Sequence, residues 1–96
     1  MTELQRLNHD IDLSTALDRL KQNNDFKALI LDEYLQDRVI SYLSLAISST
    51  LSREEQEKFS SKAYAAMYLK EFLNEIEIAG ALAKESRDTL MQNGEL

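Results

Sequence analysis

The stretch VISYLSLAI, residues 39–47, decides the fold class, because seven of its nine side chains are apolar. Such a run fits a buried strand, part of a membrane anchor, or a helix that packs on more than one side. A membrane-spanning helix needs about 20 apolar residues. This run is instead bounded by Asp37 and Arg38 on one side and by the polar sequence SSTLSREEQ on the other. The membrane interpretation therefore fails, and we expect no membrane segment.

The composition favours helix over strand. The 96 residues contain no proline and only two glycines, Gly80 and Gly94, where an average chain of this length would carry about five and seven. Few residues in this chain would therefore interrupt a helix. A chain of this length suits one small domain, residues 1–96, and domains of this size are often only marginally stable alone. We expect a single all-α domain that associates with copies of itself or with a partner.

The charge distribution argues against nucleic-acid binding. The formal net charge is −6, and each half of the chain contributes −3, from five basic and eight acidic residues in 1–48 and six and nine in 49–96. A protein that binds DNA or RNA needs a basic stripe to neutralise phosphates, and no predicted element carries one. The chain has no cysteine, and MTELQRLNHD lacks the apolar core of a signal peptide. We therefore expect synthesis inside the cell.

The first two helices are predicted from apolar spacing and polar breaks. Helical spacing of Leu13, Ala16, Leu17 and Leu20 predicts a short helix over about residues 13–22 and leaves residues 1–11 as an N-terminal arm. The polar QNND that follows interrupts the pattern, and its Asn24 or Asp25 can cap a second helix over about residues 26–49.

The third helix has the clearest local start signal. Ser52-Arg53-Glu54-Glu55 fits a capping box, and Asn93-Gly94 can supply the left-handed residue that ends a helix. The sequence therefore predicts a helix over about residues 53–92 and a C-terminal tail, 93–96. Gly80 either interrupts this helix or marks a close helix crossing. Together the second and third helices predict a long antiparallel hairpin, joined by the shorter first helix.

A helical wheel gives both long helices two apolar faces. The predicted core face of the second helix is Leu31, Leu35, Val39, Tyr42 and Ala46, and that of the third is Ala66, Leu69, Phe72, Leu73, Ile76, Ala79 and Ala83. The remaining apolar residues lie beyond a normal single-sided stripe. Either the first helix covers those on the second helix, or two or more chains join through them, a two-fold dimer being the commonest case. The predicted interface residues are Leu29, Ile40, Leu43, Ile47, Tyr64, Met67, Ile78 and Leu82.

Candidate chemical sites are incomplete. Asp10, Asp12 and Ser14 imitate the start of a calcium loop, but Thr15 stands where that loop needs glycine and Lys21 where it needs glutamate. Carboxylate-bridged metal bundles require Glu-x-x-His pairs, and the chain has one histidine. We therefore expect no enzyme activity, metal or cofactor. The acidic residues are interpreted instead as a solvated edge that meets basic partners; they are Asp32, Glu33, Asp37, Glu71, Glu75 and Glu77.

The stretch LDRLKQNNDFKALILDEYLQDRV, residues 17–39, with the polar SREEQ link and the long helix after it, resembles small acidic helical proteins of tailed bacteriophages. The resemblance spans roughly residues 15–83 and rests on packing and capping residues. It implies a helical fold and a viral setting in the host cytoplasm, with incorporation in the virion. The function expected is a non-enzymatic virion structural or assembly component that contacts itself and another viral or host protein. The alternative is an inhibitor that blocks a host defence or transcription protein.

Overall fold

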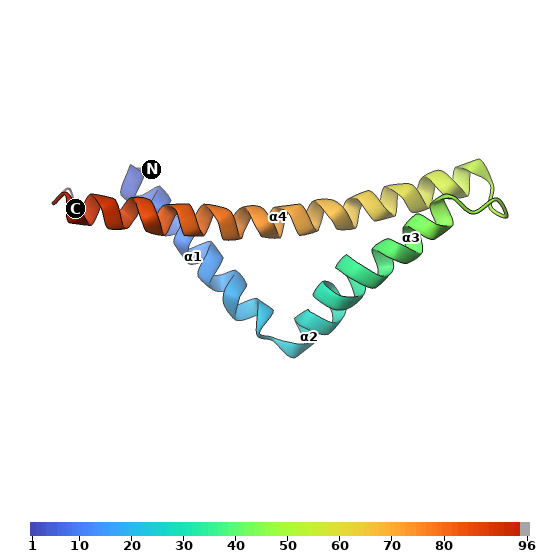
Figure 1. Ribbon diagram of the computed structural model, residues 1–96, viewed down its shortest axis with the longest axis horizontal. Helices are drawn as coiled ribbons and strands as arrows, with labels where there is room; N and C mark the ends of the chain where they lie inside the picture. The colour runs from blue at the N-terminus through green and yellow to red at the C-terminus, as the bar shows by residue number, and fades with distance from the viewer. Residues whose placement is uncertain (95–96) are drawn as a thin grey trace. The chain divides into compact units, whose positions relative to one another are not determined.

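The computed structural model describes residues 1–94, and these residues form helices, turns and short links without a strand (Figure 1). The elements are α1 (Glu3–Lys21), α2 (Asn24–Phe26), η1 (Lys27–Asp37), α3 (Arg38–Ala46) and α4 (Arg53–Gln92). The prediction of an all-α chain is therefore confirmed. No helix in this range has the length and apolar content needed to cross a bilayer.

The chain divides into two compact units where the sequence predicts one domain. Unit 1 combines Met1–Gln22 with the described part of Leu73–Leu96, and unit 2 is Asn23–Phe72. Helix α4 contributes to both, because its first twenty residues belong to unit 2 and the rest to unit 1. Each unit has its own set of contacts between helices.

Helix α1 begins ten residues earlier than predicted, so the expected N-terminal arm is wrong. Thr2 caps the helix through a capping box, in which its hydroxyl accepts the Gln5 amide hydrogen at 3.1 Å and the Gln5 side chain accepts that of Thr2 at 2.9 Å. The buried face also differs from the predicted one. It consists of Leu7, Ile11, Ser14 and Leu17, whereas the expected Leu13, Ala16 and Leu20 are exposed.

Unit 1 is an antiparallel crossing of α1 and the second half of α4. Leu7, Ile11 and Ala83 form its core, with Leu90 packed against them. Arg87 donates a hydrogen bond to Asn8 at 3.1 Å, and Lys21 forms an ion pair with Glu77. The partners of successive α1 residues thus lie progressively earlier in α4, which defines the antiparallel sense.

Gly80 lies at the closest approach in unit 1. Helix α4 continues through it, so this glycine does not interrupt the helix. A Cβ atom built on Gly80 would overlap the Oγ and Cβ atoms of Ser14 and would lie 3.3 Å from the carbonyl oxygen of Asp10. Of the two readings that the sequence leaves open, the structure therefore selects a close helix crossing.

Unit 2 begins with a continuous helical segment made of α2, η1 and α3. The Asn23 side chain caps it by accepting the Phe26 amide hydrogen at 2.9 Å. Residues 27–37 form a π-helix, and at its end the Arg38 amide donates to the carbonyl of Glu33, five residues back. The predicted core face of this segment is confirmed, because Leu35 is buried and the other four members are half-buried. The segment ends at Ala46, three residues before the predicted position.

A six-residue link, 47–52, connects α3 to α4. The predicted capping box is confirmed, since the Glu55 amide donates to the Ser52 hydroxyl at 3.1 Å and the Ser52 amide to the Glu55 carboxylate at 3.3 Å. Gln56 donates a side-chain hydrogen bond back to the carbonyl of Ser48. The local signals in this part of the sequence therefore place the start of α4 correctly.

Aromatic rings join α3 to the first turns of α4. The rings of Tyr42 and Phe59 stack with centroids 6.2 Å apart, and the Lys62 ammonium lies 5.7 Å from the first ring and 5.3 Å from the second. Ala63 and Ala66, on the next turns of α4, are buried. These contacts hold the end of α3 alongside the beginning of α4.

The C-terminal end of α4 follows the predicted signal. The helix ends at Gln92, and Gly94 adopts the left-handed conformation with φ 70°. Its amide donates to the carbonyl of Met91 at 3.2 Å. Within the predicted tail, residues 95–96 lie outside the described residues.

Candidate interaction surface

All eight predicted interface side chains are exposed. Their exposed fractions run from 45% for Met67 to 84% for Ile47. Leu29, Ile40, Leu43 and Ile47 of the second predicted helix are among them, and no helix of unit 2 covers these four side chains. The buried face of α1 packs in unit 1, with Ala83. The exposed rows are thus available to another molecule.

The two predicted rows do not both lie in one unit. Six of the eight residues belong to unit 2, while Ile78 and Leu82 belong to unit 1. In unit 1, Leu82 lines an open depression with Glu3 and Glu85. The larger share of exposed apolar side chains is therefore in unit 2, where the candidate surface is built.

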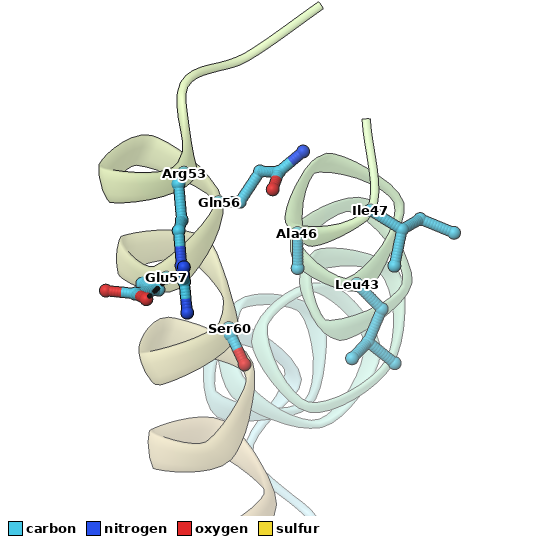
Figure 2. A pocket seen from close by; sticks show the side chains of 7 residues that line it. All are labelled: Leu43, Ala46, Ile47, Arg53, Gln56, Glu57 and Ser60. Carbon is cyan, nitrogen blue, oxygen red and sulfur yellow. Dashed lines mark hydrogen bonds and ion pairs between the residues drawn. The ribbon is translucent and has the colours of Figure 1, made fainter. Parts of the chain in front are cut away.

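The C-terminal end of α3 and the start of α4 enclose an open depression of about 460 Å³. One wall is apolar and comes from Leu43, Ala46 and Ile47. The other wall is polar and comes from α4, with Arg53, Gln56, Glu57 and Ser60. Figure 2 shows Ala46 directed toward α4, whereas Leu43 and Ile47 point away from it. The two large aliphatic side chains therefore form the outer edge of the depression.

The α4 wall continues into the second predicted row. Tyr64 and Met67 follow Ser60 at spacings of four and seven residues, which places them on the same face of α4. Met67 is 45% and Tyr64 55% exposed. We name the resulting surface of unit 2 the α3–α4 groove, with one bank formed by Ile40, Leu43 and Ile47 and the other by Ser60, Tyr64 and Met67. The banks therefore hold three residues of the first predicted row and two of the second, whereas Ile78 and Leu82 lie in unit 1.

Leu29 does not belong to this groove. The wheel aligned Leu29 with Ile47 by assuming α-helical rotation throughout, but residues 27–37 bond to carbonyls five residues back. A π-helix has more residues per turn than an α-helix, so each residue rotates less about the axis. Leu29 is 65% exposed, and its membership of an interface stays a prediction.

Two exposed aromatic residues of unit 2 were not predicted as surface. Tyr68 is 67% and Phe72 53% exposed. The sequence placed Phe72 on the core face of the third helix, and this assignment is wrong. Because a helical wheel cannot show where the neighbouring helix stops covering a face, the sequence held no signal for the exposure of Phe72.

The predicted acidic edge is partly neutralised within the chain. Glu33 forms an ion pair with Arg38 at 3.6 Å, and Glu77 pairs with Lys21. A hydrogen bond to Tyr42 and then the Glu33 carboxylate raise the pKa of Arg38, which strengthens a charge that arginine carries at all ordinary pH values. The other four acidic residues, Asp32, Asp37, Glu71 and Glu75, are exposed.

The residues whose spacing resembles the start of a calcium loop belong to a regular helix. Asp10, Asp12 and Ser14 lie within α1, where residues two apart point in different directions. Ser14 is buried and donates its hydroxyl hydrogen to the carbonyl of Ile11 at 2.9 Å. Within residues 1–94 no group of three or more potential metal ligands converges.

Comparison with known proteins finds no match to this chain. No protein-family model, curated protein or solved structure matches the chain.

Proposed function

We propose that this chain is a non-enzymatic interaction protein that acts through helix–helix contacts, as a structural or assembly component of a tailed-phage virion. The observation that carries the interaction role is the α3–α4 groove, whose banks hold five large apolar side chains that the chain leaves 45–84% exposed. The phage setting is supported by the resemblance of residues 17–39. The protein would act in the host cytoplasm and then in the particle.

The energetic argument rests on the number of exposed side chains. Full burial of a large aliphatic or aromatic residue contributes roughly 1.5–3 kcal/mol, whereas association costs about 4–15 kcal/mol. One exposed residue could not hold a complex together, but five in one groove can offset that cost. The proposal therefore requires most of the groove to be covered at once, as a partner helix would do.

The same proposal includes self-association and the long antiparallel hairpin. The stacked Tyr42 and Phe59 rings support side-by-side helices near the link. A two-fold dimer is the commonest closed assembly, and it would cover the groove with a copy of the same surface.

The second candidate is an inhibitor of a host defence or transcription protein. Four exposed carboxylates favour it, since they can meet a basic patch; they are Asp32, Asp37, Glu71 and Glu75. The pairing of Glu33 and Glu77 within the chain weakens this reading relative to the first.

Quantitative mass spectrometry of purified particles tests the proposed function and separates it from the second candidate. A virion component is expected at a fixed number of copies per particle. An inhibitor would be absent from particles and would instead be recovered with a host protein by affinity purification from infected cells. Absence from particles assembled by the encoding phage would contradict the assembly role.

The matched variants for this experiment alter the groove or a neighbouring surface. Ile40→Glu with Ile47→Glu places two charges on the α3 bank and should abolish incorporation. Ser41→Glu with Ser49→Glu adds the same charge at exposed polar positions and should leave incorporation unchanged. Because Leu31, Leu35, Val39 and Tyr42 remain intact in both variants, circular dichroism should show nearly the wild-type helix content.

A further inference from the structure

We propose that the partner in the α3–α4 groove is a second copy of this chain, and that the two α3 helices lie antiparallel about a two-fold axis near Leu43. This inference rests on the proposed function and deepens it by naming one partner and its orientation. Three observations carry it: the spacing of the exposed row, the absence of charged residues from positions 39–52, and the depression between α3 and α4.

The spacing fits a helix–helix seam. Ile40, Leu43 and Ile47 occur at i, i+3 and i+7, which is the pattern of alternating core positions in a coiled coil. The midpoint of the row falls between Leu43 and Ser44. An antiparallel pairing therefore places Ile40 of one copy against Ile47 of the second, while the two Leu43 side chains meet near the axis.

The charge pattern favours a second copy of this chain over a partner with a charged binding surface. The two charged residues in the wall of the depression, Arg53 and Glu57, pair with each other at 3.3 Å. Residues 39–52 contain no charged side chain, although 29% of the chain is charged. A two-fold contact brings each residue near the axis close to its own copy, so any charge there would face a like charge at close range. The uncharged stretch coincides with the exposed row, and the repulsion expected from a net charge of −6 is kept away from the axis.

The groove supplies additional area. A stable interface buries about 800 Å² per partner from about 20–30 residues, which three side chains cannot provide. The depression beside Leu43 and Ile47, of about 460 Å³, would receive side chains of the opposing helix. Tyr64 and Met67 then extend the contact along α4, and the stacked rings of Tyr42 and Phe59 hold the two banks together.

Cysteine cross-linking tests this geometry, because the natural chain contains no cysteine. A disulfide requires Cα atoms within about 7 Å of each other. Leu43→Cys should therefore oxidise to a covalent dimer. Ile40→Cys and Ile47→Cys should each remain largely monomeric, because each is displaced from its own copy by about 10 Å along the axis at about 1.5 Å per residue. The double variant that carries both cysteines should cross-link.

Ser41→Cys is the matched control, since this exposed residue of α3 lies outside the row. All variants are compared after oxidation at micromolar concentration, on a non-reducing gel, with circular dichroism as a check of helix content. Cross-linking of Ile40→Cys and Ile47→Cys as single variants would show parallel pairing and overturn the proposal. Equal cross-linking of Leu43→Cys and Ser41→Cys would also overturn it.

Light scattering of the wild-type chain separates this inference from the proposed function. A dimer has twice the 11.0 kDa mass of one chain, and an apolar interface should persist when salt screens charge contacts. A monomer at both low and high salt would overturn the inference. If that monomer is nevertheless found in particles at fixed copy number, the proposed function stands with a different partner.

Discussion

The two units join helices in different ways. In unit 1, α1 approaches α4 closely at a position that only glycine fits, and polar side chains tie the helices on either side of it. In unit 2, α3 meets α4 through large rings and small buried alanines, and it leaves aliphatic side chains uncovered at the edge of the contact. In unit 1 the two helices pack closely where Gly80 has no side chain. In unit 2 the contact between α3 and α4 leaves apolar side chains exposed along one side.

This difference connects packing with function. A contact that depends on close approach is sensitive to one added methyl group, because protein interiors are densely packed. A contact with an uncovered apolar edge tolerates change at that edge until a partner binds there. We therefore expect substitutions in unit 1 to affect folding, and substitutions on the groove of unit 2 to affect association.

The largest expected effect tests whether unit 2 has a defined core despite its exposed face. Leu35 is 8% exposed and Leu29 is 65% exposed, and both lie in η1. Leu35→Ala should lower the free energy of unfolding by about 2–5 kcal/mol, as expected for a buried leucine. Leu29→Ala should cost well under half as much. Chemical denaturation of both variants measures this, and equal losses would show that η1 does not face the core as described.

A somewhat smaller effect is expected at the close crossing in unit 1. Gly80→Ala would gain about 1 kcal/mol of helix propensity, but its Cβ would overlap Ser14 and force the helices apart at a cost of about 1–3 kcal/mol or more. We expect net destabilisation.

Ser14→Gly provides the matched rescue for this crossing, since it removes both overlapping Ser14 atoms. The double variant Ser14→Gly with Gly80→Ala should therefore be more stable than the sum of the two single changes predicts. A double-mutant cycle by thermal denaturation measures this coupling. Additive effects would mean that the crossing is looser than the structure shows.

The smallest effect compares the two capping boxes. Ser52→Ala should cost about 1 kcal/mol, because the amides at the start of α4 lose a partner. Thr2→Ala removes the equivalent hydroxyl from α1, but it should cost less, since threonine is a weaker N-cap residue than serine. Melting temperatures of both variants test this order, and an unchanged value for Ser52→Ala would contradict the described start of α4.

Local signals allowed several features to be predicted correctly. The Ser52–Glu55 capping box, the end of α4 at Asn93-Gly94 and the core face of Leu31, Leu35, Val39, Tyr42 and Ala46 each depend on residues within a few turns. The Thr2–Gln5 box has the same pattern and could have been found by the same rule. The sequence therefore contains a local signal for the start of α1 at Glu3.

A helical wheel cannot predict the π-helix. The wheel assumes one fixed rotation per residue, whereas hydrogen bonding over five residues in η1 changes that rotation. The place of Leu29 relative to Ile40 therefore cannot be taken from the wheel alone. The Glu33–Arg38 ion pair, five residues apart, fits the π-helical geometry.

By itself, the sequence determined that the chain is helical, where α4 starts and ends, and which residues of α3 could be exposed, because these properties follow from backbone caps and from the spacing of apolar side chains. Only the tertiary structure decided the role of Gly80 and placed Leu43 and Ile47 beside the first turns of α4. The physical reason is that an overlap with Ser14, or a groove between Leu43 and Ser60, exists only when segments far apart in the chain meet. No local pattern encodes those distances.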